Sequence, residues 1–186
     1  EHEVLNAADT IIVTSKTTKT EFQAITNKPI EVITNGYDVE KVARPILDEK
    51  FTLAHIGSLL SERNPKILWE SLSQLLSEIP DFKNNFELKL IGAVSQEVLN
   101  TISEYKLDAF LKNVGYVSHD EAVLQQRKSQ VLLLIEINSE ETKSIIPGKL
   151  FEYMVSERPI IAIGPNDSDF AEIITNTNTG VFVKYD

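Results

Sequence analysis

The chain has 186 residues, a net charge of −10, a hydrophobic fraction of 42% and no cysteine. The length suits one domain with a sizeable core, and the lack of cysteine excludes disulfides, thiol catalysis and cysteine-based zinc sites. The negative charge argues against a general nucleic-acid binder, which needs a basic surface, and no apolar run reaches the ~20 residues of a membrane-spanning helix. Because the chain starts at Glu1 and no signal-peptide pattern follows, we expect a fragment of a longer protein.

The first 36 residues predict a short unit that precedes the main part of the chain. Residues 1–8 are typical of the end of a helix, and strands are expected at 10–13 and 30–33. Ser15 is suited to cap a helix that runs to about Asn27. The segment 37–50 follows an Asn–Gly turn signal and has mixed charge with no clear periodicity, so we interpret it as a linker or hinge.

From Phe51 onward, apolar strands and amphipathic helices alternate regularly. Strands are expected at 51–56, 86–91, 111–114, 131–135, 160–163 and 181–183, and helices at 65–79, 96–105, 120–127, 147–155 and 170–175. This alternation predicts a parallel sheet with helices on both faces. With right-handed crossovers, it becomes a doubly wound, Rossmann-like α/β fold over residues 51–186.

Four glycines directly follow predicted strands, and these are Gly57, Gly92, Gly115 and Gly164. In an open parallel sheet, ligands bind in the crevice outside the carboxyl ends of the strands. Glycine at this edge allows a ligand to approach the backbone closely. The alternative is that short strand-to-helix turns favour glycine, which explains one or two such positions better than four.

The helix expected at 147–155 carries a cation where the helix dipole disfavours one. Pro147 and Gly148 open the helix, and Lys149 falls in its first turn. This placement is favourable if an anionic ligand docks on the free backbone N–H groups there. Glu152 lies three residues on and shares a face with Lys149. A base for phosphate beside an acid for hydroxyls suits a nucleotide-sugar, whereas the alternative is a surface Lys–Glu pair on a core helix.

The turn after the strand at 51–56 contains a second candidate for phosphate binding. Asn64 and Pro65 are a good cap and a good first residue for the next helix, which leaves Arg63 just outside the helix N-terminus. Arginine holds a phosphate with two donors at once. The turn has neither the Walker pattern nor the GxGxxG fingerprint. The alternative is a solvated surface arginine.

Several other polar residues have simpler structural interpretations. His55 lies within a predicted strand, where packing or hydrogen bonding is favoured over catalysis. Ser118 and Glu121 form a capping-box pattern. The Asp167–Ser168–Asp169 segment matches a DxD metal-binding pattern, but acids and serine are favoured at a helix start, so capping is preferred. No cluster of His, Asp or Glu has metal-ligand spacing, and we expect no metal site.

Taken in order, these segments resemble the C-terminal, donor-binding half of a GT-B glycosyltransferase of the family 4 type. The segments that carry the resemblance are 8–15, 32–38, 55–59 with 63–65, 88–92, 114–117, and 147–153 with 158–160. The resemblance implies that 1–36 is a remnant of the N-terminal domain, namely its last strand, helix and strand. It also implies that 37–50 is the interdomain hinge and that 51–186 binds a nucleotide-sugar donor.

In such enzymes, a sugar moves from a nucleotide-diphosphate sugar to an acceptor. The resemblance therefore implies a hexosyltransferase, retaining and metal-independent, with a UDP- or GDP-linked donor and no cofactor. Arg63 and Lys149 would neutralise the diphosphate, and Glu152 would accept hydrogen bonds from the ribose hydroxyls. These three residues form the implied catalytic set. The implied donor-binding residues are Gly57, Ser58, Gly115, Tyr116, Val117, Ile145, Ile146, Pro147, Gly148 and Leu150, of which 115–117 would line the base.

The chain also departs from the family pattern. The family commonly has two glutamates eight positions apart, but the residue eight positions before Glu152 is Ser144, and Glu140 and Glu141 are out of register. Most of the acceptor-binding domain is missing. We therefore expect a monomeric fragment that binds donor without turnover. In the full-length protein, the missing domain would hold the acceptor, which would be a carbohydrate or a lipid-linked glycan. We expect the full-length protein in the cytoplasm, either free or in peripheral contact with the inner membrane.

Two other functions fit the pattern less well. A non-catalytic nucleotide- or sugar-binding module of the same fold is the first alternative, because Ser144 stands where a glutamate is usual. A flavodoxin-like regulatory domain is the second. It would place acids around a phosphorylatable aspartate at the strand ends, where this chain has glycines.

Overall fold

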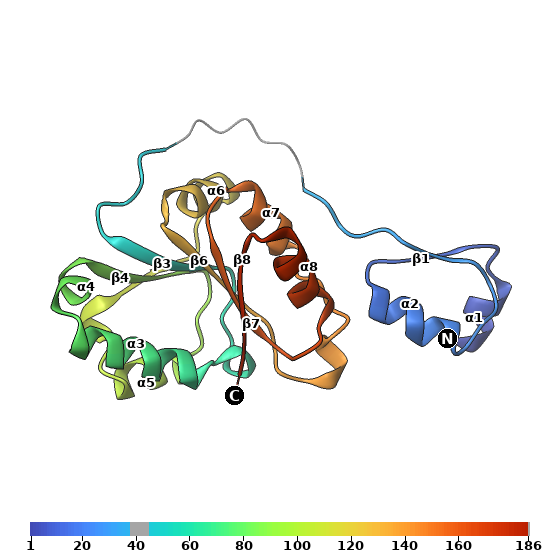
Figure 1. The fold of residues 1–186 in the computed structure, drawn as a ribbon, viewed down its shortest axis with the longest axis horizontal. Helices are drawn as coiled ribbons and strands as arrows, with labels where there is room; N and C mark the ends of the chain where they lie inside the picture. The colour runs from blue at the N-terminus through green and yellow to red at the C-terminus, as the bar shows by residue number, and fades with distance from the viewer. Residues whose placement is uncertain (38–44, 186) are drawn as a thin grey trace.

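The computed structural model describes residues 1–37 and 45–185. Residues 1–37, here called the N-terminal unit, contain α1 (His2–Ala7), β1 (Ile11–Val13), α2 (Lys16–Gln23) and β2 (Ile30–Val32). The strands β1 and β2 pair in parallel (Figure 1). Of the predicted hinge at 37–50, residues 38–44 lie outside the described residues, as does Asp186 of the predicted donor domain.

The local sequence predicted the elements of the N-terminal unit well, except for the C-terminal end of α2. The Ser15 hydroxyl accepts a hydrogen bond from the backbone N–H of Thr18 at 3.2 Å, which confirms Ser15 as the cap of α2. The helix ends at Gln23 rather than near Asn27. Thr26 is buried, and its hydroxyl donates to the Asn6 side chain of α1 at 2.8 Å. This bond holds the segment after Gln23 outside the helix.

The remainder of the chain forms a six-stranded sheet in the order β5-β4-β3-β6-β7-β8, and every pair is parallel. The strands are β3 (Phe51–Ile56), β4 (Phe86–Ile91), β5 (Leu111–Gly115), β6 (Val131–Ile135), β7 (Ile160–Gly164) and β8 (Gly180–Lys184). All six predicted strands are present within a residue of their predicted ends. The parallel doubly wound sheet is therefore confirmed.

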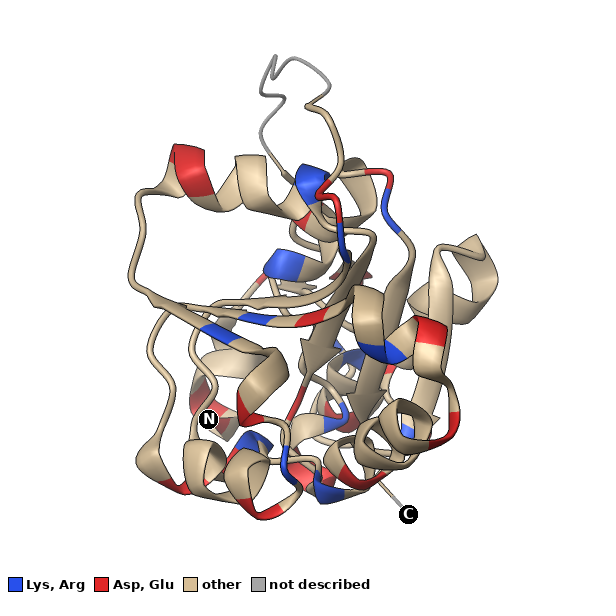
Figure 2. Cartoon of the chain, turned by 90° about the vertical axis from the view of Figure 1, so that its left-hand side faces the viewer, with Lys and Arg blue, Asp and Glu red and all other residues tan. Residues whose placement is uncertain are grey.

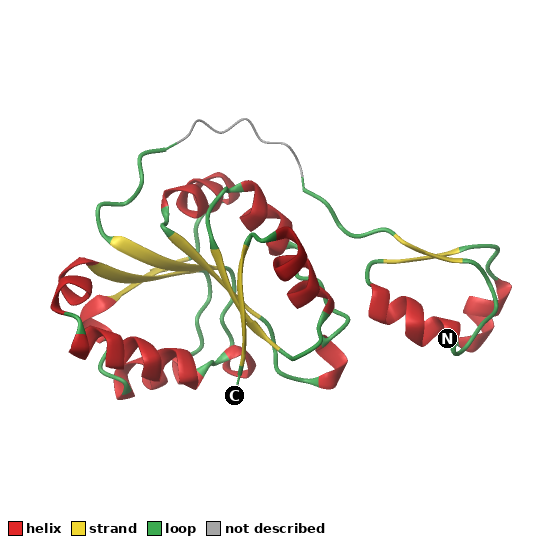
Figure 3. Cartoon of the chain, in the orientation of Figure 1, coloured by secondary structure: helices red, strands yellow, loops and turns green. Residues whose placement is uncertain are grey.

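Helices cover both faces of this sheet (Figure 3). One face carries α3 (Lys66–Glu78), α4 (Pro80–Asn85) and α5 (Gln96–Glu104), whose apolar side chains pack around the fully buried Trp69. The other carries α6 (His119–Lys128), α7 (Lys149–Val155) and α8 (Asp169–Thr177), which pack around Tyr153 and Phe170. Three single-turn helices, Ser61–Arg63, Asp108–Phe110 and Glu140–Thr142, lie in the connections.

The region around α3 differs from the sequence prediction at both ends of the helix. Asn64 is not the cap, because α3 starts at Lys66 and the Asn64 side chain accepts from the indole N–H of Trp69 at 2.7 Å. A buried Trp N–H needs such an acceptor, so packing decides the role of Asn64. α3 ends at Glu78, one residue before the predicted end, and Pro80 opens α4, a short helix that the sequence did not predict.

Asp169, the last residue of the DxD segment, caps the N-terminus of α2 and not that of α8, the helix in which it lies. The Asp169 carboxylate accepts from the backbone N–H groups of Lys16 at 3.0 Å and Thr17 at 3.2 Å, in the first turn of α2. The Lys16 ammonium also pairs with Glu172. Negative charge is favourable at a helix N-terminus, so these acids of α8 hold the N-terminal unit.

The end of the predicted hinge is attached to the main sheet. Asp48 accepts from the ammonium of Lys89 at 2.6 Å, and Lys89 is almost fully buried in β4. The Gln130 side chain donates to the Asp48 carbonyl at 2.6 Å. The chain is thus held to the sheet at Asp48, before β3 begins.

Charges do not form a continuous stripe on the face seen in Figure 2, where basic and acidic residues are interspersed along the helices. No helix among the described residues combines the length and apolar character needed to cross a bilayer.

Candidate functional site

The strand order locates a crevice at the carboxyl ends of β3 and β6. The chain adds β4 and β5 on one side of β3, and then β6, β7 and β8 on the other. The order therefore reverses between β3 and β6, and such a switch point is where open α/β sheets bind ligands. Gly57 directly follows β3, and Glu136 directly follows β6. These two residues border the candidate site.

A buried tyrosine fixes α7 over the end of β3. The Tyr153 hydroxyl accepts from the backbone N–H of Ile56 at 2.9 Å and donates to the carbonyl of the same residue at 3.2 Å. Tyr153 is fully buried, and its burial raises the pKa of the phenol. Lys149 lies one turn earlier, so this anchor places its side chain next to Gly57.

Lys149 is a cation that has no ion-pair partner in the part of the chain that the structure describes. A Cβ at Gly57 would lie 2.3 Å from its Nζ, and Gly57 has a φ of +132°, so glycine permits both the backbone conformation and the approach of the ammonium. Among the described residues, nothing forms a hydrogen bond or ion pair with Lys149 Nζ. Burial lowers the pKa of Lys149, as does Arg63, whereas Glu136 and Glu152 raise it.

Arg63 is paired with Glu136, the residue that follows β6. Its Nε and Nη2 donate to the same carboxylate oxygen at 3.1 and 2.9 Å, and the backbone N–H of Ile137 donates to that oxygen at 2.9 Å. The Glu136 side chain is 4% exposed and that of Arg63 is 28% exposed. Arg63 is therefore not a solvated surface residue. It is held at the crevice with part of its side chain accessible.

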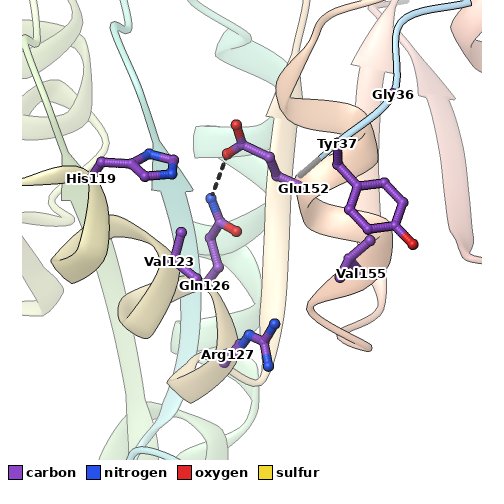
Figure 4. Close-up of a pocket in the computed structure, with 8 residues that line it drawn as sticks. All are labelled: Gly36, Tyr37, His119, Val123, Gln126, Arg127, Glu152 and Val155. Atoms are coloured by element: carbon purple, nitrogen blue, oxygen red, sulfur yellow. Dashed lines mark hydrogen bonds between the residues drawn. The ribbon is translucent and has the colours of Figure 1, made fainter. Parts of the chain in front are cut away.

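Glu152 lines a cavity of about 490 Å³ between α6 and α7. Figure 4 shows the lining residues, which are Gly36, Tyr37, His119, Val123, Gln126, Arg127, Glu152 and Val155. The amide of Gln126 donates to the Glu152 carboxylate at 3.0 Å. Two of the lining residues, Gly36 and Tyr37, come from the N-terminal unit, so this cavity opens between the two parts of the chain.

The structure thus brings Arg63, Lys149 and Glu152 to one end of the sheet, together with Gly57. The other predicted donor-binding residues differ in how exposed they are. Ser58, Tyr116, Ile145 and Gly148 are exposed, Gly115 has open space at its Cα, and Val117 and Ile146 pack partly on the core. Pro147 is half-buried and precedes α7, which begins at Lys149. Leu150 is buried in the core, and its N–H donates to the Pro147 carbonyl at 2.9 Å, so it presents neither group to a ligand.

Two of the four strand-end glycines have a structural explanation. A Cβ at Gly92 would lie 2.5 Å from the carbonyl oxygen of Gly57, and one at Gly164 would lie 2.4 Å from the Phe170 ring. At these positions the protein itself makes the close approach, and a ligand is not needed to explain the glycine. Gly57 is approached by the Lys149 ammonium and a Cβ at Gly115 would have nothing within 4 Å, so these are the two strand-end glycines that border the candidate site.

Sequence reasoning missed three residues that shape the site, Glu136, Gln126 and Tyr153. Glu136 had a usable signal, because it directly follows the most apolar strand, where a ligand crevice is expected. Tyr153 and Gln126 had none, since a tyrosine on an apolar helix and a glutamine on a polar one are ordinary. In the part of the chain that the structure describes, no three His, Asp or Glu side chains are grouped to hold a metal ion.

Below the crevice, His55 is expected to make stability depend on pH. It is fully buried, and its Nδ1–H donates to the Leu133 carbonyl at 2.9 Å, in agreement with the structural interpretation. Burial, and then the positive charge of Lys149, lowers the pKa of His55 to about 3. The unfolded chain takes up this proton near pH 6.5, so stability is complete above that pH and is lost as pH falls toward 3, by up to about 1.4 kcal/mol per pH unit.

Denaturant unfolding at pH 7 and pH 5 measures this effect. We expect the wild type to lose about 2 kcal/mol more than His55→Asn between these two values. His2→Gln, which removes an exposed histidine, serves as the control and should behave as the wild type. Equal losses in the wild type and His55→Asn would contradict the prediction.

Comparison with known proteins finds likeness in structure and not in sequence. No family model matches the sequence, and no curated protein matches it. HepE from Anabaena in complex with UDP matches with a TM-score of 0.70 and 17% identity, over 95% of this chain and 50% of that one. WaaG, a glycosyltransferase involved in lipopolysaccharide biosynthesis, matches with a TM-score of 0.67 and 14% identity, over 93% and 48%.

A third match is sucrose-phosphate synthase from Thermosynechococcus elongatus, with a TM-score of 0.66 and 19% identity, over 98% of this chain and 47% of that one. The chain spans about half the length of these proteins. At such identities the likeness concerns the fold. The chain therefore has the fold of part of a GT-B protein, and its six-stranded sheet forms one Rossmann-like half, as the sequence predicted.

Proposed function

We propose that this chain is the donor-binding part of a glycosyltransferase that uses a nucleotide-diphosphate sugar. The observation that carries the proposal is the Lys149 ammonium, which is held against Gly57 at the switch point of the sheet and has no ion-pair partner among residues 1–37 and 45–185. A partly buried cation without an anion is unfavourable, and a bound phosphate removes this cost. Proteins of the same fold support the proposal, because HepE was solved with UDP and glucose, and TarM in a complex containing UDP.

The proposed chemistry is the transfer of a hexosyl group. The bond from the anomeric carbon to the diphosphate oxygen breaks and its electron pair stays on that oxygen, the oxygen of an acceptor hydroxyl bonds to the carbon, and the hydroxyl proton passes to the departing diphosphate. Lys149 and Arg63 stabilise the negative charge that develops on the departing nucleotide diphosphate, which is electrostatic catalysis. Glu152 accepts hydrogen bonds from the ribose. Since two side chains provide the positive charge, we propose a metal-independent reaction, and from the family resemblance a retaining one.

The rest of the proposal concerns the full-length protein. The acceptor, a carbohydrate or a lipid-linked glycan, binds to residues outside this chain, so the chain alone binds donor without turnover. The donor is UDP- or GDP-linked, the reaction is cytoplasmic, and the chain is a monomer. A turnover assay that detects acceptor-dependent sugar transfer by this chain alone would contradict the absence of turnover.

One observation favours a second function, a non-catalytic nucleotide- or sugar-binding module. Ser144 stands where the family has its first glutamate. The nearby Glu140 pairs with Lys143 at 2.8 Å and is largely exposed. Donor hydrolysis or sugar transfer by the full-length protein would decide for the enzyme.

Titration with UDP, GDP and ADP, followed by amide NMR shifts, tests donor binding. We expect one nucleotide to shift the amides of 57–63, 115–117 and 149–152, and the preferred base narrows the donor. Uridine is the matched control, because it lacks the diphosphate and should leave the amides near Lys149 unshifted. If no nucleotide moves these amides at millimolar concentration, the proposal is wrong.

A further inference from the structure

We infer that Gln126 is a positioning residue, whose side-chain amide orients the Glu152 carboxylate toward the ribose hydroxyls of the bound nucleotide. The inference rests on the proposed function and deepens it. The observation is the hydrogen bond of 3.0 Å from Gln126 Nε2 to Glu152 Oε2, which joins α6 to α7 across the cavity wall.

The burial of Gln126 calls for an explanation. Only 3% of this residue is exposed, although glutamine is mostly a surface residue. Val123, one turn earlier on α6, is also buried and is apolar. A position of this kind serves packing better with an apolar side chain, because burying an amide is unfavourable unless its hydrogen-bonding groups are satisfied. The bond to Glu152 offsets that cost.

The geometry leaves part of the carboxylate available to a ligand. In Figure 4 the Gln126 amide and the Glu152 carboxylate point toward one another from neighbouring helices, at the wall of the cavity. Gln126 engages Oε2, and a carboxylate has two oxygens that each accept more than one hydrogen bond. The amide group donates without adding charge. It therefore holds the carboxylate in one orientation while Oε1 stays available to a vicinal diol.

Because Gln126 orients the Glu152 carboxylate before the ligand binds, the pair should have a measurable effect on ligand affinity. A glutamate side chain loses rotamer freedom when it binds a ligand, and a pre-formed hydrogen bond removes that loss from the binding step. If Gln126 acts in this way, its contribution depends on the ribose hydroxyls and on Glu152. It does not depend on the diphosphate, which lies with Lys149 and Arg63.

The test compares UDP, 2′,3′-dideoxy-UDP and inorganic pyrophosphate on the wild type and on Gln126→Leu, by calorimetry. If GDP binds more tightly than UDP, GDP and 2′,3′-dideoxy-GDP replace UDP and its dideoxy analogue. The wild type should prefer UDP over the dideoxy analogue at least tenfold, and Gln126→Leu should lose most of this preference by weaker binding of UDP alone. Thermal unfolding of the variant confirms that it folds.

A double-mutant cycle separates positioning from a general structural role. Gln126→Leu combined with Glu152→Ala should bind UDP no more weakly than Glu152→Ala alone, because Gln126 acts through Glu152. Pyrophosphate affinity should stay the same in all variants. If pyrophosphate binds but Gln126→Leu keeps the ribose preference, or the wild type has none, the inference is wrong. If neither pyrophosphate nor UDP binds, the proposed function fails as well.

Discussion

Lys149→Met is expected to weaken UDP binding about 100-fold and to leave the free energy of unfolding unchanged or higher. Methionine keeps a long, flexible stem but removes the charge. Hydrogen bonds to charged groups contribute about 1.5–3 kcal/mol each, and about 2.8 kcal/mol corresponds to a factor of 100 in affinity. Stability should not fall, because the ammonium is partly buried without a partner among the described residues and its burial is unfavourable.

Calorimetric titration and denaturant unfolding of the same samples measure both effects. Lys66→Met is the matched control, because Lys66 is exposed in the first turn of α3 and its loss removes the same charge away from the crevice. The control should bind UDP as the wild type does. Unchanged UDP affinity in Lys149→Met would remove the main support for a diphosphate at Gly57.

Arg63→Ala is expected to lower both stability and UDP affinity, for two different reasons. The substitution leaves the Glu136 carboxylate buried without its ion-pair partner. Loss of one partner of a buried pair costs about 3–5 kcal/mol, and because Arg63 is 28% exposed we expect about 2–4 kcal/mol here. UDP affinity should fall because one of the two cations of the crevice is gone.

A second substitution separates the two effects. In Arg63→Ala combined with Glu136→Gln, the buried charge is removed, so most of the lost stability should return. UDP affinity should remain low, because no cation is restored. Denaturant unfolding and calorimetry at one pH give both values. If the double variant is as unstable as Arg63→Ala, the ion pair does not explain the loss.

Much of the fold was predictable because its signals are local. Most strands of the main sheet are largely apolar and bounded by turn residues, and all six, including the more polar edge strand β5, are present within a residue of their predicted ends. Element ends were less predictable, since they depend on contacts from elsewhere. The Asn64 side chain pairs with a buried Trp69 and Thr101, and the Thr26 side chain pairs with Asn6. In both cases a tertiary hydrogen bond outweighs the local capping or helical preference.

The candidate site was predictable residue by residue but not as an arrangement. The sequence singled out Arg63, Lys149 and Glu152, because charged residues at strand ends and in first helical turns are chemically conspicuous. It contained no indication of their partners. Arg63 bonds to Glu136, 73 residues away, and Tyr153 bonds to Ile56, 97 residues away.

The sequence by itself thus determined the class of fold, and it predicted the edge of the sheet for the candidate site and three charged residues there. Only the tertiary structure decided that β3 and β6 are neighbours, that Lys149 lies against Gly57, and that Gln126 meets Glu152. The physical reason is the parallel sheet. Its neighbouring strands are joined by crossovers through helices, so the residues that meet at the carboxyl ends come from distant parts of the chain, and their separation in sequence does not reveal the pairing.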